Sequence, residues 1–176
     1  LLLANRLGDL SGDIAVVVSN HSELEPVAAH FQVPFVCIAG DAAEREHESL
    51  LARERIGLVV LARYMQILSP AFVTRRRGQI INIHHSFLPA FVGARPYHQA
   101  KERGVKLIGA TAHYVTEELD QGPIIEQAVA HVSHRDAVED MIRKGRELER
   151  QTLTRAVRLH LEHRVLINGN RTVVFA

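Results

Sequence analysis

The sequence predicts an α/β fold: a doubly wound, mostly parallel sheet flanked by helices, with a C-terminal β-hairpin. Two patterns support this fold class. Short apolar runs recur along the chain with helical stretches between the early ones, which is typical of parallel strands buried on both faces. Near the C-terminus, Asn168-Gly169 lies between two strand-like runs, and this dipeptide is a strong signal for a hairpin turn.

The individual elements follow from residue type and spacing. The expected strands are the short apolar runs at residues 14–19, 35–39, 58–62, 80–83, 107–114 and 124–129. Apolar residues at helical spacing predict helices over residues 1–10, 25–31, 41–55 and 136–163. Ser69 and Pro70 predict the N-cap and first residue of a short helix over residues 70–76, which Gly78 ends. The expected arms of the hairpin are residues 165–167 and 172–175.

Length and composition describe one globular domain over residues 1–176. Lys and Arg number 21 and Asp and Glu 20, a net charge of +1 that disfavours a dedicated nucleic-acid binder. No apolar run reaches the roughly 18 residues that cross a bilayer, so we expect no membrane partner. The single cysteine, Cys37, fits a reducing, cytoplasmic location, and its apolar strand predicts that it is buried.

Polar side chains interrupt the apolar pattern at the ends of two expected strands. Asn82 and His84 project from the same face of their strand because side chains alternate with a period of two, so His85 is expected to point the other way. His113 and Asp120 follow in the next long strand and the turn after it. Each alone is compatible with an ordinary structural role. Together, an amide, imidazoles and a carboxylate can polarise a carbonyl group and move a proton.

A metal site is the alternative interpretation of the histidines. The chain has 11 His, and the candidates are His84, His85, His98 and His113. Neighbouring strand residues diverge, no cysteine assists, and the chain has no His-Glu-x-x-His helix. We therefore predict no metal site and no cofactor.

The chain resembles the formyltransferase superfamily that uses 10-formyltetrahydrofolate. That superfamily has an Asn-x-His strand motif and a downstream Asp, which Asn82, His84 and Asp120 match. Within the superfamily, three segments are similar to the formyltetrahydrofolate deformylases: residues 82–89, 93–100 and 168–175. The resemblance covers nearly the whole chain and implies a formyltransferase-like, Rossmann-type catalytic domain.

The implied activity is hydrolysis of the formyl amide C–N bond of 10-formyltetrahydrofolate, which gives tetrahydrofolate and formate. We expect Asp120 to orient and help deprotonate the attacking water. His84 and Asn82 would donate hydrogen bonds to the formyl oxygen and stabilise the oxyanion. His113 would tune Asp120 or His84 by pairing. The resemblance places this reaction in one-carbon metabolism, where it supplies formate for purine synthesis.

The same resemblance implies a folate site with two walls. Backbone groups would bind the flat pterin and apolar side chains would contact its faces. Plain core packing is the alternative role for Met65 and Leu68. The expected folate-binding residues are Leu61, Arg63, Tyr64, Met65, Gln66, Ile67, Leu68, Val115, Thr116 and Glu117.

Two other functions compete with hydrolysis. A transferase passing the formyl group to an amine such as phosphoribosylglycinamide would use the same Asn82, His84 and Asp120. In that transferase the superfamily resemblance implies an N-terminal phosphate-binding loop, and a Pro where this chain has His85, so the sequence favours the deformylase. A non-catalytic folate-binding module would not need the three polar residues together.

The resemblance also sets expectations about chain organisation and assembly. Deformylases carry an N-terminal ACT-type regulatory domain and a first catalytic-domain strand. Because this chain opens on a helical pattern, we expect both to belong to the full-length chain and to lie outside residues 1–176. The superfamily further implies a homo-oligomer.

Overall fold

The computed structural model describes residues 1–40, 42–89 and 96–175. The chain divides into two compact units, residues 1–59 and 60–176, and each is described by itself. That the whole chain forms one catalytic domain stays a prediction. Among the described residues, no helix combines the length and apolar character needed to span a bilayer.

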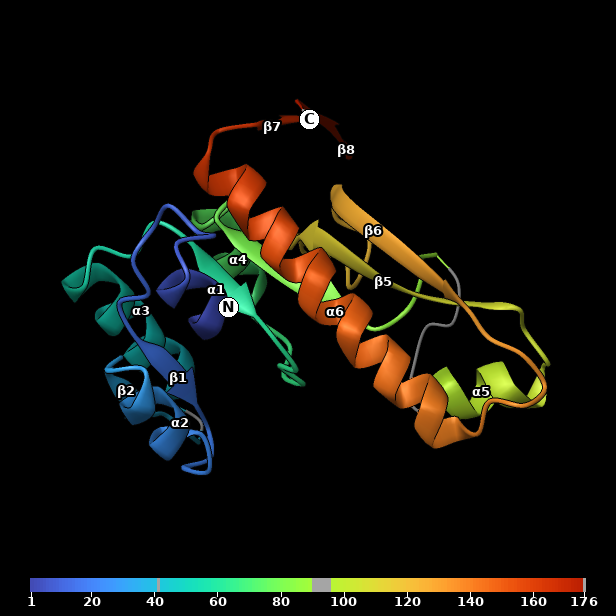
Figure 1. Cartoon of the computed structure of the whole chain (residues 1–176). Helices are drawn as coiled ribbons and strands as arrows, with labels where there is room; N and C mark the ends of the chain where they lie inside the picture. Colours follow the sequence, from blue (N-terminus) through green and yellow to red (C-terminus); the bar gives the residue numbers. More distant parts are fainter. Residues whose placement is uncertain (41, 90–95, 176) are drawn as a thin grey trace. The chain divides into compact units, whose positions relative to one another are not determined.

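The first unit is a small α/β layer (Figure 1). Strands β1 and β2 pair in parallel, with Val17 opposite Phe35. Helix α2 provides the crossover that a parallel pair requires. The hydrophobic core of the first unit is formed by Ile38, Ala43 and Leu50. The elements are α1 (Leu2–Arg6), β1 (Val17–Ser19), α2 (Glu25–His30), β2 (Phe35–Cys37) and α3 (Ala43–Arg53).

The second unit contains a four-stranded sheet in the order β3-β4-β5-β6 and a separate hairpin, β7-β8. The long helix α6 packs along β5 and β6 and also contacts β4 (Figure 1). The elements of the second unit are β3 (Val59–Leu61), α4 (Pro70–Arg75), β4 (Ile80–His84), α5 (Pro96–Glu102), β5 (Leu107–Tyr114), β6 (Ile124–His131), α6 (Val138–Leu161), β7 (Val165–Asn168) and β8 (Arg171–Val174).

The expected α/β class and the C-terminal hairpin are confirmed, and the strand directions refine the expectation of a mostly parallel sheet. Parallel pairing is found between β1 and β2, whereas β4–β5 and β5–β6 are antiparallel. For β5 and β6 the reason is the connection over residues 115–123, which is shorter than the dozen or so residues that a parallel crossover needs.

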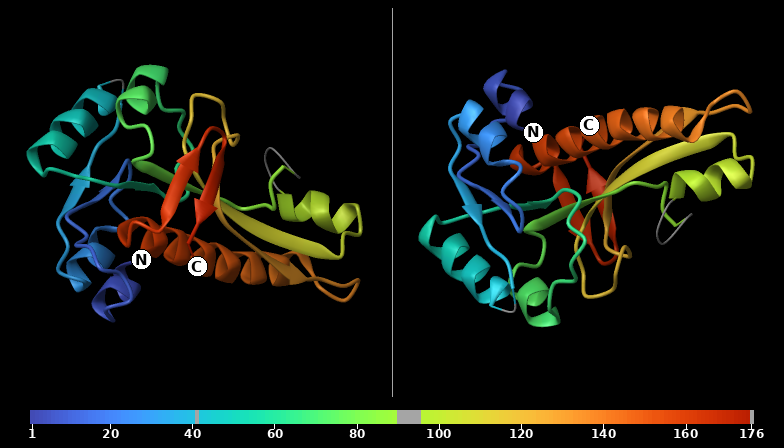
Figure 2. Two further views of the ribbon diagram at one scale, coloured as in Figure 1. Left: turned by 90° about the horizontal axis from the view of Figure 1, so that it is seen from above. Right: turned by 90° about the horizontal axis from the view of Figure 1, so that it is seen from below.

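Several local predictions are confirmed. The Ser69 side chain accepts a hydrogen bond from the Phe72 backbone N–H at 3.2 Å, and Pro70 opens α4. The C-terminal hairpin forms as predicted and can be seen in Figure 2. Its turn is Gly169-Asn170, one residue later than expected, because Asn168 pairs with Arg171 and Gly169 takes a φ of +61°. Its β8 strand lies beside β6.

Two local predictions are wrong. Cys37 is exposed rather than buried, because it ends a strand of three residues and its side chain alternates away from the core. The N-terminal helix spans only Leu2–Arg6 instead of residues 1–10, since Gly8 takes a positive φ of +82° that an α-helix cannot contain.

Helix α6 is joined to β5 by a hydrogen bond between the hydroxyl of Tyr114 and Nδ1 of His160 at 2.8 Å. Burial raises the pKa of Tyr114 to about 12, so the phenol stays protonated and donates this bond. Burial, followed by the neighbouring His163, lowers the pKa of His160, which keeps its ring available as an acceptor.

The connection over residues 115–123 packs tightly against the end of β5. The backbone N–H of Tyr114 donates to the carbonyl of Pro123 at 2.9 Å. A Cβ at Gly122 would overlap the carbonyl oxygen of Tyr114. Only glycine therefore allows this close approach of the two backbone segments.

Gly122→Ala should lower the free energy of unfolding by about 1–3 kcal/mol, because the connection must move away from β5 to admit the methyl group. Gly57→Ala is the matched control, since a Cβ at Gly57 meets nothing within 4 Å. Chemical denaturation of both variants measures the difference. Equal stability of the two would contradict the close approach.

Candidate active site

The pairing of β4 with β5 brings the polar residues of both strands to one face of the sheet. Asn82 lies directly opposite His113, and His84 lies opposite Thr111. Side chains of directly opposed residues in an antiparallel pair share a face and come into contact. The amide of Asn82 and Nε2 of His113 are accordingly 3.3 Å apart.

Asp120 approaches this cluster from the connection between β5 and β6. One carboxylate oxygen lies 3.2 Å from Nδ1 of His84, and the other lies 3.7 Å from Nε2 of His113. Asp120 has a φ of +56°, in the left-handed region that Asp tolerates better than most residues. The four predicted catalytic residues therefore come together around one carboxylate.

The hydrogen bonds assign the tautomer of His113. Its Nδ1 lies 2.9 Å from the backbone carbonyl of Tyr114, which can only accept, so Nδ1 carries a proton. In the neutral ring, Nε2 is then an acceptor and receives a hydrogen bond from the amide of Asn82. Nε2 also lies 3.7 Å from an Asp120 oxygen, which is longer than a hydrogen bond, and it attracts that carboxylate only in the imidazolium form, when Nε2 carries a proton as well.

The surroundings of Asp120 keep it ionised. The polar interaction with His113 lowers the pKa of Asp120 most, partial burial opposes this, and His84 lowers the pKa further. The side chains of His84 and His113 are 9% and 3% exposed, so their interactions with the carboxylate are little screened by water.

His85 departs from the sequence expectation. Instead of pointing away from His84, its ring stacks on the His84 ring, with centroids 5.1 Å apart and planes 14° apart. The alternation of side chains holds only within a strand, and β4 ends at His84.

Thr111 and Gln127 form a buried network that sequence reasoning missed. The Thr111 hydroxyl donates to the carbonyl of Ser86 at 2.9 Å and accepts from the N–H of Leu88 at 3.1 Å. The amide of Gln127 donates to the same hydroxyl at 2.9 Å and to the carbonyl of Leu88 at 3.2 Å. These bonds hold the chain that follows the two histidines against the sheet. The sequence contains one weak signal for Thr111. It lies two residues before His113, so the two side chains project from the same face of the strand.

The expected folate-binding residues occupy two separate segments. Residues 62–69 form no helix or strand and include two highly exposed apolar side chains, Met65 at 78% and Ile67 at 83%. The core-packing alternative is therefore wrong for Met65, while Leu68 and the neighbouring Leu61 and Tyr64 are partly buried.

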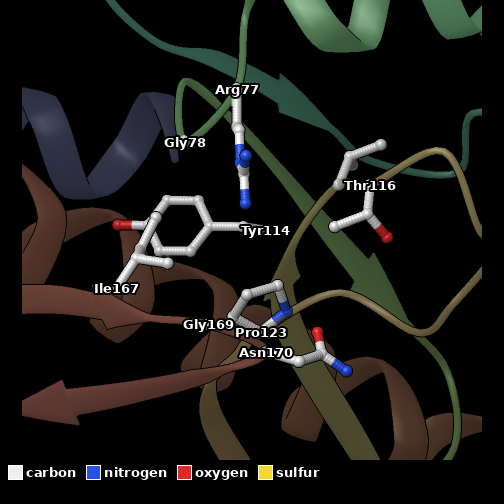
Figure 3. A pocket seen from close by; sticks show the side chains of 9 residues that line it. Arg77, Gly78, Tyr114, Thr116, Pro123, Ile167, Gly169 and Asn170 are labelled. Carbon is white, nitrogen blue, oxygen red and sulfur yellow. The ribbon is translucent and has the colours of Figure 1, made fainter.

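The other folate segment begins at the end of β5. Val115 and Thr116 line a small pocket of about 240 Å³, which Figure 3 shows together with Arg77 and Tyr114. Glu117 lies outside that lining and accepts a hydrogen bond from the Thr74 hydroxyl at 2.7 Å.

A larger open cleft is lined by residues of the connection and of the C-terminal hairpin. Its volume is about 550 Å³, and Asp120 lines it with Leu88, Gln127 and the hairpin residues Asn170 and Arg171. The small pocket of Figure 3 has none of the four predicted catalytic side chains in its lining. The cleft that reaches the carboxylate is therefore the better location for the chemistry.

Within the described ranges, no three His, Cys, Asp or Glu side chains have an arrangement that could hold a metal ion. His98 lies on α5, and residues 93–95 of the segment that resembles the deformylases fall outside the described residues.

Thr111→Val should reduce the free energy of unfolding by about 2–4 kcal/mol, because each buried backbone group that loses a partner costs roughly 1–3 kcal/mol. Thr116→Val is the control, since its hydroxyl bond to the carbonyl of Glu118 is exposed. Urea denaturation should show the control within about 0.5 kcal/mol of the parent. A similar effect of both substitutions would argue against the network.

Acid should weaken the contribution of Asp120 to stability. The pKa of Asp120 is lower in the folded chain than in the unfolded chain. As the pH falls, the unfolded chain is therefore protonated first. The full stabilisation is present only above the ordinary pKa of an aspartate, about 4. It is lost as the pH falls through the folded-state pKa. The difference in unfolding free energy between the parent and Asp120→Asn should therefore shrink below about pH 4. A difference that persists unchanged at pH 2 would contradict this.

Comparisons with known proteins show which proteins this chain resembles. A formyltetrahydrofolate deformylase from Synechocystis is 57% identical over 176 residues, covering 97% of this chain and 62% of the relative. A solved formyltetrahydrofolate deformylase from Pseudomonas syringae has a TM-score of 0.96 and 52% identity, covering 99% of this chain and 60% of that chain.

A phosphoribosylglycinamide formyltransferase from Anaplasma phagocytophilum has a TM-score of 0.91 and 32% identity, covering 99% of this chain and 87% of the other. The chain thus spans about three fifths of the deformylases that it matches. The model of the formyl transferase family matches residues 1–157. This chain belongs to the formyl transferase family.

Proposed function

We propose that this chain hydrolyses 10-formyltetrahydrofolate to tetrahydrofolate and formate. The observation that carries the proposal is the contact of one Asp120 carboxylate with both His84 and His113, with Asn82 beside them. Relatives that are 50–57% identical are named formyltetrahydrofolate deformylases, whereas a phosphoribosylglycinamide formyltransferase is 32% identical.

His84 and Asn82 would stabilise the oxyanion. Because Nδ1 of His84 lies 3.2 Å from Asp120, the opposite ring nitrogen, Nε2, which is buried in the structure, would be the donor to the formyl oxygen once the substrate is bound. The carboxylate stabilises the imidazolium form, in which Nε2 is a donor. The amide of Asn82 has two N–H groups, so one can bond to His113 and the second to the oxyanion.

Asp120 would activate the water. Its lowered pKa keeps it a carboxylate that accepts a hydrogen bond from the water and orients it. As the water oxygen bonds to the formyl carbon, that oxygen becomes positively charged, and even a weakly basic carboxylate can take its proton. The proton then leaves with N10 of tetrahydrofolate as the C–N bond breaks, and formate is released.

The pterin would lie between residues 63–68 and 115–117. The apolar side chains proposed to contact its faces include Ile67 and Met65, whose exposure leaves them accessible to a ligand. No resident metal or cofactor takes part in this reaction scheme. The water, the formyl group and the protein side chains supply every atom that moves.

Transfer of the formyl group to an amine is the second candidate, because an amine and water require nearly the same stabilisation of the tetrahedral intermediate. The similarity to a phosphoribosylglycinamide formyltransferase, at 32% identity, supports this second candidate. Formate release measured with and without phosphoribosylglycinamide separates the two. An obligatory requirement for the amine would exclude hydrolysis as the activity.

Asp120→Asn in the full-length protein should abolish formate release and leave folate binding largely intact. The amide can still accept from His84, so the local geometry is retained, but it cannot take a proton. Stopped assays of formate measure turnover, and calorimetry with a non-reactive folate analogue measures binding. Turnover equal to that of the parent protein would remove Asp120 from the mechanism.

A further inference from the structure

His84 is held at two different parts of its ring. Asp120 contacts the edge, at Nδ1, with a distance of 3.2 Å. His85 covers a face, with centroids 5.1 Å apart and planes 14° apart. A contact at the ring edge positions one atom, whereas a stacked ring also constrains the plane of its neighbour.

His85 is in turn backed by Tyr97 of helix α5. The two ring centroids are 6.4 Å apart and the planes are tilted by 35°. The distance is within the range over which aromatic rings attract one another, about 4.5–7 Å. The rings of His84, His85 and Tyr97 therefore form one series of contacts, which we call the ring stack. His84 and His85 are stacked, and Tyr97 is tilted against His85.

Helix α6 anchors the far end of the ring stack. The Tyr97 hydroxyl donates to a carboxylate oxygen of Glu149 at 3.3 Å. A Cβ at Gly145 would overlap the Tyr97 hydroxyl and ring, so the absence of a side chain there makes room for the tyrosine. Burial, followed by the charge of Glu149, raises the pKa of Tyr97, which keeps the phenol protonated as a donor.

We propose that His85, supported by Tyr97, is a positioning residue that holds the plane of the His84 imidazole. This inference rests on the proposed function, in which Nε2 of His84 donates to the formyl oxygen. A hydrogen bond to a developing oxyanion is directional, because it weakens steeply as the N–H turns away from the oxygen. The ring stack constrains the plane of the ring, and the contact with Asp120 positions its edge.

The two other interpretations of His85 make different predictions. As an acid or base, His85 would need its ring nitrogens and not only its flat surface. As a residue of purely structural importance, it would affect folding and not the chemical step. A positioning residue needs an aromatic ring, and its loss lowers kcat while KM changes little, because the oriented hydrogen bond forms in the transition state.

Steady-state formate release by the full-length protein tests this. His85→Ala should lower kcat about 10- to 100-fold with KM within about threefold, since small misplacements of catalytic groups cost this much. His85→Phe keeps the flat ring without its nitrogens and should recover most of kcat with the parent pH profile. His134→Ala, an exposed histidine between β6 and α6, is the control and should match the parent.

The support from α6 is tested by a double-mutant cycle. Gly145→Ala should displace the Tyr97 ring and lower kcat in the parent background. In a Tyr97→Ala background the added methyl meets no ring, so the same substitution should cause no further loss. Thermal unfolding of each variant shows whether it is folded at the assay temperature, and this cycle does not depend on any substitution at His85.

Three results would overturn the proposal: full kcat in His85→Ala, a His85→Phe variant as impaired as His85→Ala, or an additive effect of Gly145→Ala and Tyr97→Ala. Failure of the proposed function is a separate outcome. It would be seen as absence of formate release from the parent protein, before any variant is compared.

Discussion

The register between β4 and β5 is the constraint on which the site depends. In an antiparallel pair, a shift by one residue moves every side chain of a strand to the opposite face. Such a shift would separate Asn82 from His113 and would also move Ile81 and Ile83, which are 0% and 8% exposed, from the face on which they pack to the face that carries the polar residues. The burial of these two isoleucines therefore fixes the contacts of the polar residues that alternate with them.

The register alone leaves the site without its carboxylate, which the short connection after β5 supplies. A longer connection would leave Asp120 free to point into solvent. The close approach of Gly122 to the backbone of Tyr114 and the left-handed backbone at Asp120 turn the chain sharply, and the carboxylate then meets imidazoles from both β4 and β5. A strained residue at this position is typical of a functional site, where the surrounding structure holds it in place.

The patterns of single segments predicted what lies within one segment, and the family resemblance predicted the site that joins several. Neither predicted the packing partners of that site. The shared face of Asn82 and His84 follows from the period of a single strand, and α6 follows from one helical pattern. Thr111 and Gln127 are partners only because β5 and β6 pair in one register, which no pattern within either strand shows. The stack on His84 was mispredicted for a related reason: the rule of alternation was applied beyond the last residue of the strand.

The two buried histidines beside Asp120 are chemically distinct because their Nδ1 atoms donate to different acceptors. His84 donates to a carboxylate, whose negative charge favours a proton on the opposite nitrogen as well. His113 donates to the neutral carbonyl of Tyr114, and its Nε2 accepts from Asn82. In the proposed mechanism the first imidazole would donate to a substrate oxygen, while the second would orient the amide of Asn82. The two roles differ because His113 contacts a neutral backbone carbonyl and His84 contacts a carboxylate. Both residues are histidines, so residue type alone could not assign the roles.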